Sequence, residues 1–447
     1  MSDPKVVTRF APSPTGLLHL GNYRTAIFAY LYAKKHQGNF ILRIEDTDKE
    51  RSKKEYEENI VESLKWLGLS YDEFYRQSER LDRHKFYLEK MIKDGNAYIS
   101  KEKAKDGSDV IKELVRFKNP NSEVTFRDEI KGEVTMNTTD LGDFVIARNL
   151  NEPLFHLAVV VDDFEAKVTH VIRGEDHLSN TPRQILIQRA IGAGAPIYAH
   201  VPLVLGPDKL KLSKRRGALP LTEYKKRGYL PEAILNGVTF VGWNPGTAKE
   251  IFSREELIKN FDFKRVQKSP AIFNEEKLEW FNKEHIKLLP AEEIKKNILE
   301  WLPEKMRDII TKRPSFGTKD GLLGVIRERI SKWSDVREMA ERGELSFFFK
   351  PPEYRKEKLI YKNLGMEKTV DNLKSAVQAL ENLEEKNFTP ENIKNILTLA
   401  ADKLENRGEL LHPVRYALSG ADQSPDPFII ASIIGKNETL SRLQKAI

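Results

Sequence analysis

The stretch VVTRFAPSPTGLLHLGN, residues 6–22, contains the first signal of the fold. Its apolar run at 6–10 is typical of a buried strand, and the prolines and glycine that follow predict a turn. Beyond the turn, apolar residues recur at 20, 23, 27, 30 and 31 on one face of a helix that should stop by Gly38. The predicted order is therefore strand, turn, helix.

The start of this helix is suited to binding phosphate. A helix N-terminus presents N–H groups without partners and a partial positive charge. His19 can hydrogen-bond a phosphate oxygen, and Gly21 has no Cβ, so a nucleotide can come close. A single His-x-Gly pattern is more often an ordinary surface histidine. The prediction therefore depends on a second motif, KLSKR at 211–215, whose alternative interpretation is a solvated basic turn.

The next segments repeat the alternation of strand and helix. An apolar run at 40–44 predicts a second buried strand that ends at Glu45, and a helix with one apolar face follows and closes at Gly68. Strands separated by helices predict a doubly wound, parallel, Rossmann-like sheet of the α/β class. Ligands of such sheets bind at the carboxyl ends of the strands.

The chain divides by pattern into four parts. The alternation returns beyond residue 154 with apolar runs at 157–161 and 168–173 and a helix that begins at Pro182, with Thr181 as its cap. In between, short charged runs predict antiparallel strands in an inserted α+β module. We predict a catalytic domain at 1–80 and 154–205, the insertion at 81–153, a region with the lysine motif at 206–305, and an all-helical domain at 306–447.

The composition limits the class of protein. The 447 residues, 40% of them hydrophobic, can form about three domains. The lack of cysteine excludes disulfides, a cysteine nucleophile and a thiolate zinc site. No secretory leader and no run of ~18 apolar residues is found, so we expect a cytoplasmic protein without membrane contact. A net charge of +7 permits an RNA partner without requiring one.

Several catalytic templates are missing from the sequence. It has no P-loop, Gly-x-Gly-x-x-Gly, His-Glu-x-x-His or Gly-x-Ser-x-Gly pattern. What remains at the predicted strand ends is His19, Glu45, Arg173 and Lys214, with no covalent nucleophile paired to a base. Such a set suits binding and charge neutralisation, which is most of what transfer at phosphorus requires.

Six motifs, taken together, resemble the class I glutamyl-tRNA synthetases of bacterial type. They are PSPTG at 12–16, HLGN at 19–22, RIEDTD at 43–48, RGEDH at 173–177, KLSKR at 211–215 and HPVRYALSG at 412–420. They occur in the order of the family and extend over almost the whole chain. Many class I synthetases share the first signature and the lysine motif, whereas 9–16 and 43–48 are typical of the glutamate/glutamine branch.

The resemblance implies an ATP site. His19 and Gly21 would contact the triphosphate, and Lys214, with Lys211 in support, would neutralise charge on the leaving pyrophosphate. The catalytic residues implied are His19, Lys211 and Lys214. The implied ATP-binding set is Pro12, His19, Gly21, Asn22, Lys211, Ser213 and Lys214, with Mg²⁺ accompanying the ATP.

The resemblance also implies an amino-acid site. Arg9 would pair with the side-chain carboxylate of glutamate, since a guanidinium offers two parallel bonds to a carboxylate. Glu45 would accept from the α-ammonium group. A salt bridge at the strand ends is the structural alternative for both residues. The implied glutamate-binding set is Arg9, Ala11, Ser13, Glu45, Phe155 and Arg173.

This sequence departs from the family pattern at two places. Phe155 stands where the family commonly has a tyrosine, so His156 or a water would substitute for the hydroxyl, or Phe155 would only wall the pocket. Many bacterial relatives also have a zinc-binding cysteine cluster near 95–120, and this chain has no cysteine there. We therefore expect no metal ligands and no structural zinc.

The function implied is ATP-dependent ligation of L-glutamate to tRNA-Glu through a glutamyl-adenylate, by a monomeric aminoacyl-tRNA synthetase. The insertion and the 206–305 region would contact the acceptor arm, and the helical domain would bind the anticodon. The alternatives are an enzyme that also charges tRNA-Gln and an inactive tRNA-binding paralogue. A glutamine-specific enzyme usually ends in β-barrels, which this helical tail does not predict.

Overall fold

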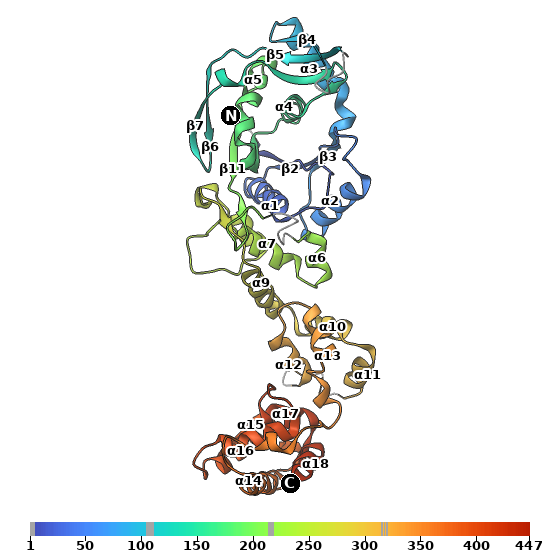
Figure 1. The fold of residues 1–447 in the computed structure, drawn as a ribbon, viewed down its shortest axis with the longest axis vertical. Helices are drawn as coiled ribbons and strands as arrows, with labels where there is room; N and C mark the ends of the chain where they lie inside the picture. The colour runs from blue at the N-terminus through green and yellow to red at the C-terminus, as the bar shows by residue number, and fades with distance from the viewer. Residues whose placement is uncertain (1–4, 104–110, 213–218, 314–315, 317, 319–320) are drawn as a thin grey trace. The chain divides into compact units, whose positions relative to one another are not determined.

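The structure is a computed structural model that describes residues 5–103, 111–212, 219–313, 316, 318 and 321–447. The chain forms two compact units, Met1–Asn282 and Lys283–Ile447. The first unit, coloured blue to yellow in Figure 1, contains the sheets, and the second is helical.

A seven-stranded sheet forms the centre of the first unit, in the order β3-β2-β1-β10-β11-β6-β7. Its first five strands are parallel, as the alternating pattern predicts. The chain order reverses between β1 and β10, which is the position where ligands bind to doubly wound sheets. The parallel strands are β1 (Val7–Phe10), β2 (Asn39–Ile44), β3 (Glu73–Arg76), β10 (His170–Gly174) and β11 (Ile197–Val201).

Helices cover this sheet. The α1 helix (Leu20–Lys35) follows the predicted turn, and α2 (Lys54–Leu67) ends at Gly68, which has the left-handed conformation that glycine adopts without strain. Helix α5 (Thr181–Ile191) begins one residue earlier than predicted, because Asn180 rather than Thr181 is its N-cap.

The apolar run at 157–161 lies within a helix, α4 (Phe155–Glu165). None of these five side chains is more than 3% exposed. Apolar runs of this length do not distinguish a buried strand from a fully buried helix. The helix therefore stands where the alternation alone suggested a strand.

The segment between α3 (Leu81–Lys93) and α4 forms two antiparallel groups of strands. One is a separate four-stranded sheet, and the other is a hairpin whose first strand pairs in parallel with β11 through Asp128 and Tyr198. The hairpin thus extends the main sheet as well as belonging to the inserted segment. The strands are β4 (Ala97–Lys103), β5 (Ile111–Phe117), β8 (Phe144–Asn149) and β9 (Glu152–Pro153) in the separate sheet, and β6 (Glu123–Asp128) and β7 (Gly132–Asn137) in the hairpin.

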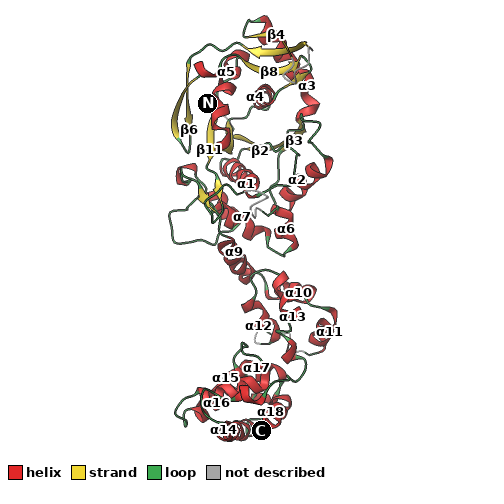
Figure 2. Cartoon of the chain, in the orientation of Figure 1, coloured by secondary structure: helices red, strands yellow, loops and turns green. Residues whose placement is uncertain are grey.

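The chain leaves the main sheet through β12 (Val204–Leu205), which pairs with β13 (Ala271–Ile272). In the described part of 219–447 the remaining regular elements are helices, red in Figure 2, which loops connect. None of the described helices is both long and apolar enough to cross a membrane. The helices are α6 (Leu221–Lys226), α7 (Pro231–Thr239), α8 (Arg254–Asn260), α9 (Glu275–Leu288), α10 (Ala291–Trp301), α11 (Glu304–Lys312), α12 (Leu322–Arg329), α13 (Ser334–Glu341), α14 (Met366–Glu381), α15 (Pro390–Ala401), α16 (Gly408–Ser419), α17 (Pro427–Ile434) and α18 (Lys436–Ala446).

Candidate active site

A cavity of about 680 Å³ opens at the carboxyl ends of β1, β2, β10 and β11, where the strand order reverses. Every predicted site residue within the described part of the chain lines it. Ser213 and Lys214 lie outside the described residues. The residues brought together are Arg9, Ala11, Pro12, Ser13, His19, Gly21, Asn22, Glu45, Phe155, Arg173 and Lys211.

The turn after β1 is held against the end of β2. The Glu45 N–H donates to the Pro12 carbonyl at 3.0 Å, and the Lys53 N–H donates to the Pro14 carbonyl at 3.0 Å. These bonds fix the turn that leads from Arg9 to the start of α1. Parts of the site that come from two strands are thereby joined through the backbone.

His19 is the N-cap of α1, with extended backbone geometry. Its N–H donates to Asn22 Oδ1 at 3.2 Å, so the two residues are linked across the first turn. A Cβ on Gly21 would lie 3.3 Å from the His19 ring, closer than most such contacts. A side chain at 21 would therefore crowd the ring at the helix end that faces the cavity.

Arg9 is 4% exposed, and its hydrogen bonds determine which of its atoms are left for a ligand. Its Nε donates to Asp163 Oδ1 at 3.1 Å, and its Nη1 donates to the Ile172 carbonyl at 3.4 Å. The salt bridge of Arg9 is with a carboxylate of α4, not with Glu45. Nη2 has no partner among the described residues.

Glu45 lies at the end of β2 and is 8% exposed. Burial raises the pKa of Glu45, and the charges of Arg43 and Arg9 act against this rise. Arg43 Nη2 donates to Glu45 Oε1 at 3.0 Å. The arginine two residues earlier on the same strand thus stabilises the charged form of the carboxylate.

Arg173 is buried at the end of β10 and is held by three neighbours. Its Nη1 donates to Gln184 Oε1 at 2.7 Å, its Nη2 to Thr181 Oγ1 at 2.9 Å, and its Nε contacts His200 Nε2 at 3.2 Å. Burial lowers the pKa of Arg173 to about 10, so it is a cation at neutral pH. Five N–H groups on a guanidinium leave two for a ligand.

Phe155 is the first residue of α4 and lines the cavity, whereas His156 does not. Burial lowers the pKa of His156 to about 4, and its Nδ1 has no hydrogen-bond partner among the described residues. His156 is therefore not placed to replace a tyrosine hydroxyl. Phe155 packs against the ring of His177, whose pKa burial also lowers to about 4, so neutral rings form this wall.

Lys211 is the described part of the lysine motif. Its Nζ lies 3.3 Å from Asp176 Oδ2, and its side chain is 58% exposed. A β-bridge between Leu205 and Lys211 holds the segment beside the end of β12. The cation is thus at the solvent edge of the cavity.

Sequence reasoning missed several residues of the site. Arg24, on α1, lines the cavity and donates to the carbonyls of Pro202 and Val241, and burial lowers its pKa to about 10. Asp176 and His177 also line the cavity. The RGEDH motif at 173–177 could have predicted Asp176 and His177, since it contains both. Arg24 lies within the helical pattern of α1, where no motif distinguishes it.

Comparison with known proteins identifies the family. Residues 5–106 and 99–280 match the family described as tRNA synthetases class I (E and Q), catalytic domain, and residues 274–447 match the anticodon binding domain family. The chain belongs to the class I tRNA synthetases of the glutamate and glutamine branch. The resemblance inferred from the motifs and the predicted fold class are both confirmed.

Relatives of the family match the whole chain. It is 39% identical to the glutamate–tRNA ligase of Aquifex aeolicus (strain VF5), over 99% of both chains. It is 40% identical to that of Thermodesulfovibrio yellowstonii, again over 99% of both. A crystal structure of a glutamate tRNA ligase from Elizabethkingia meningosepticum, in complex with its amino acid, superposes with a TM-score of 0.82 at 32% identity, covering 99% of both chains.

Metal ligands were not predicted for this chain. Within the described ranges, no group of three or more histidine, aspartate or glutamate side chains is placed to hold a metal ion. The family implies the use of ATP. The expectation of no structural zinc stays a prediction.

Proposed function

We propose that this protein ligates L-glutamate to tRNA-Glu in two steps. A carboxylate oxygen of the glutamate α-carboxyl attacks the α-phosphorus of ATP, and pyrophosphate leaves. A hydroxyl of the terminal ribose of the tRNA then attacks the activated carbonyl, and AMP leaves. The observation that carries the proposal is the cavity at the strand reversal, which both Arg9 and Glu45 line. The positive Arg9 suits the γ-carboxylate of glutamate, and the negative Glu45 suits its ammonium group.

The amino acid would be selected by charge. The γ-carboxylate would bind Arg9, whose Nε is already engaged and whose Nη2 is available. The ammonium group would bind Glu45. Glutamine lacks the negative charge, and leaving a buried guanidinium without its carboxylate would cost several kcal/mol, of the order of 3–5. Arg173, Ala11, Ser13 and Phe155 complete the proposed glutamate site.

The ATP would lie across the start of α1. His19, Gly21, Asn22 and Pro12 surround this helix end, where N–H groups and the helix dipole favour phosphate. Magnesium enters as the counter-ion of the ATP substrate. Lys211 would approach the triphosphate from the solvent edge, and Ser213 and Lys214 complete the proposed set from outside the described residues.

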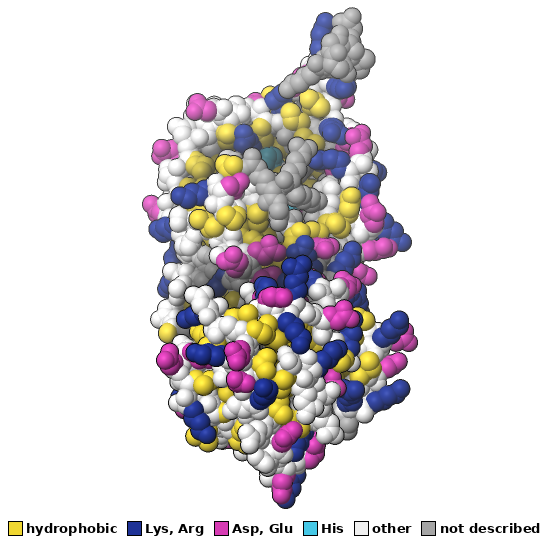
Figure 3. Space-filling model, turned by 60° about the horizontal axis from the view of Figure 1, so that its bottom comes forward, with side chains coloured by type: hydrophobic (Ala, Val, Ile, Leu, Met, Phe, Trp, Pro, Cys, Tyr) yellow, Lys and Arg dark blue, Asp and Glu magenta, His cyan; other side chains and the backbone are white. Residues whose placement is uncertain are grey.

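The second unit is proposed to bind the tRNA anticodon, as its match to an anticodon binding domain suggests. On the face drawn in Figure 3, the described lysine and arginine side chains are interspersed with aspartate and glutamate. Affinity for the RNA would then come from individual contacts more than from one large basic field. The inserted segment 81–153 and residues 206–305 are proposed to contact the acceptor arm.

The remaining parts of the proposal follow from this role. We propose a monomer that works in the cytoplasm, where tRNA is charged for protein synthesis. An inactive paralogue is not favoured, since the relatives that match the whole chain are named ligases. No observation favours the charging of tRNA-Gln.

The test is aminoacylation by the full-length protein with labelled glutamate and transcripts of tRNA-Glu and tRNA-Gln. We expect charging of tRNA-Glu with glutamate, release of pyrophosphate and no charging with glutamine. Activity should survive removal of zinc by a chelator. Failure to charge tRNA-Glu by a folded protein, with ATP, magnesium and glutamate present, would refute the proposal.

A further inference from the structure

Four buried side chains of alternating charge run from β1 through α4 to β2. Arg9 Nε donates to Asp163 Oδ1 at 3.1 Å. The same oxygen accepts from Arg43 Nη1 at 2.6 Å, and Arg43 Nη2 donates to Glu45 Oε1 at 3.0 Å. The two outer members of the series are the residues proposed to bind the two charged ends of glutamate.

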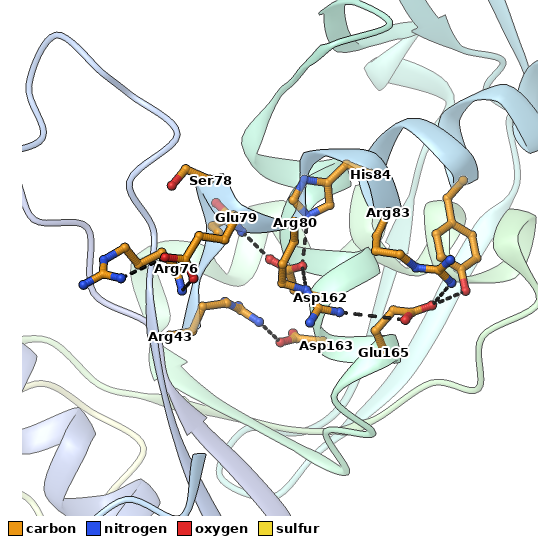
Figure 4. Close-up of polar contacts among 12 residues, drawn as sticks. Arg43, Arg76, Ser78, Glu79, Arg80, Arg83, His84, Asp162, Asp163 and Glu165 are labelled. Atoms are coloured by element: carbon orange, nitrogen blue, oxygen red, sulfur yellow. Dashed lines mark hydrogen bonds and ion pairs between the residues drawn. The ribbon is translucent and has the colours of Figure 1, made fainter. Parts of the chain in front are cut away.

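The two inner members do not face the cavity. Arg43 and Asp163 are absent from its lining, and Arg43 is 0% exposed. Figure 4 shows Arg43 reaching from β2 to Asp163 on α4. A buried charge is tolerated only when it is paired and hydrogen-bonded, so each inner residue depends on both of its neighbours.

The electrostatics of the four groups are consistent with this dependence. Burial would raise the pKa of Asp163, yet the charges of Arg9 and Arg43 lower it. Burial raises the pKa of Glu45 and Arg43 opposes the rise. The charge of Arg43 therefore favours the ionised form of both carboxylates, whereas the charge of Asp163 adds to the rise in the pKa of Glu45.

We propose that Asp163 and Arg43 are positioning residues for the amino-acid substrate. Asp163 holds Arg9 by its Nε, which leaves Nη2 for the ligand while Nη1 donates to the Ile172 carbonyl. Arg43 fixes the Glu45 carboxylate that receives the ammonium group. Neither touches the substrate. The inference rests on the proposed glutamate specificity and adds the residues that set its geometry.

The neighbouring residue provides a matched control. Asp162 is also buried on α4, but its carboxylate accepts from Gln77 Nε2 at 2.9 Å and Arg80 Nε at 3.0 Å, and contacts His84 Nε2 at 2.9 Å. Figure 4 shows Arg80 and His84 above Asp162, whereas Arg43 lies lower in the view and reaches Asp163. Neither Asp162 nor any of its three partners lines the cavity. Asp162→Asn and Asp163→Asn therefore each remove one buried negative charge, and the two charges belong to different sets of partners.

The experiment compares Asp163→Asn with Asp162→Asn in the full-length protein. Pyrophosphate exchange is measured with tRNA present, while glutamate and ATP are varied separately, and thermal unfolding is followed for each variant. We expect Asp163→Asn to raise KM for glutamate at least tenfold and KM for ATP less than twofold. Asp162→Asn should lower Tm and leave both KM values within twofold.

A second variant covers the case in which Asp163→Asn does not fold. Arg43→Gln removes the cation that donates a hydrogen bond to Glu45. The other charged groups that act on Glu45 are Arg9 on β1, Arg173 on β10 and Asp163 on α4. Glu45 must be ionised to bind an ammonium group. Its pKa should rise further, so the acid limb of kcat/KM for glutamate should move to higher pH, by at least half a unit. Arg43→Lys, which keeps the charge, should restore most of the wild-type profile.

The outcomes separate the two proposals. If the wild type does not activate glutamate, the proposed function fails. If the wild type does so and Asp163→Asn raises KM for ATP as much as KM for glutamate, or Asp162→Asn raises KM for glutamate equally, the positioning role is wrong. An unchanged pH profile in Arg43→Gln contradicts it as well.

Discussion

The two ends of the cavity are built in different ways. At the proposed amino-acid end, Arg9 is 4% exposed and is fixed by a buried carboxylate. At the proposed phosphate end, Lys211 has a side chain that is 58% exposed and lies 3.3 Å from Asp176. Groups held in place before binding favour the selection of one amino acid, whereas the charge of an exposed cation is screened by water and salt.

The largest expected effect is at the buried end. Arg9→Ala should lower kcat/KM for glutamate by roughly 10² to several thousandfold, which corresponds to about 3–5 kcal/mol in the activation free energy. The reason is that Asp163 and the substrate carboxylate both lose a partner. KM for ATP should change little. A steady-state series in each substrate checks this, with thermal unfolding to separate misfolding from loss of binding.

An equal loss for both substrates would contradict the comparison. Arg9 would then support the fold of the whole site instead of the amino-acid end. The matched control is Arg76→Gln. Arg76 lies at the end of β3, pairs with Glu57 and Glu79, and does not line the cavity. That variant should keep both KM values.

A slightly smaller effect is expected for Lys214, which lies outside the described residues. Lys214→Ala should raise the barrier to activation by roughly 3–4 kcal/mol and so lower the rate about 10²–10³-fold. The reason is that the cation proposed to neutralise charge on the leaving pyrophosphate is removed. Stability should be unchanged. Single-turnover formation of the adenylate measures this step directly, and a near-normal rate would remove Lys214 from the mechanism.

The motifs at the strand ends could be predicted because their spacing is local. The strand at 6–10, the turn and α1 follow one another in the sequence, so the pattern alone predicts where His19 and Gly21 lie, whereas the role of Arg9 is implied by the resemblance. The second strand ends at Glu45 for the same reason. Parallel strands bring such ends to one edge of a sheet.

The partners of these residues could not be predicted, because they are distant in the chain. Asp163 lies 154 residues from Arg9 and 120 from Arg43. The apolar run before Asp163 does not show whether the segment is a strand or a helix. In the helix at 155–165, Asp162 and Asp163 reach different partners, which the sequence does not specify. The pairing of β6 with β11 is also set by tertiary contact.

Falling pH should affect the two ends unequally. The pKa of Glu45 is raised by burial, so its carboxylate takes up a proton at a higher pH than an exposed glutamate. Below that pKa, KM for glutamate should rise by roughly tenfold per pH unit, while KM for ATP stays level until the phosphates titrate. Substrate-varied kinetics between pH 5 and 8 test this, and parallel curves would show that the same group controls both ends.

The smallest effect is expected at Lys211. Its pairing with Asp176 is exposed on both sides, 58% and 50%, and exposed pairs contribute about 0.2–1 kcal/mol. Lys211→Gln should therefore raise KM for ATP about two- to fivefold, and the difference from wild type should shrink with added salt, which screens exposed charges. Lys225→Gln, on the exposed side of α6, is the control for a general loss of positive charge. A loss near 10²-fold that salt does not reduce would mean that Lys211 contacts the transferring phosphate directly, and the phosphate end would then be as preorganised as the amino-acid end.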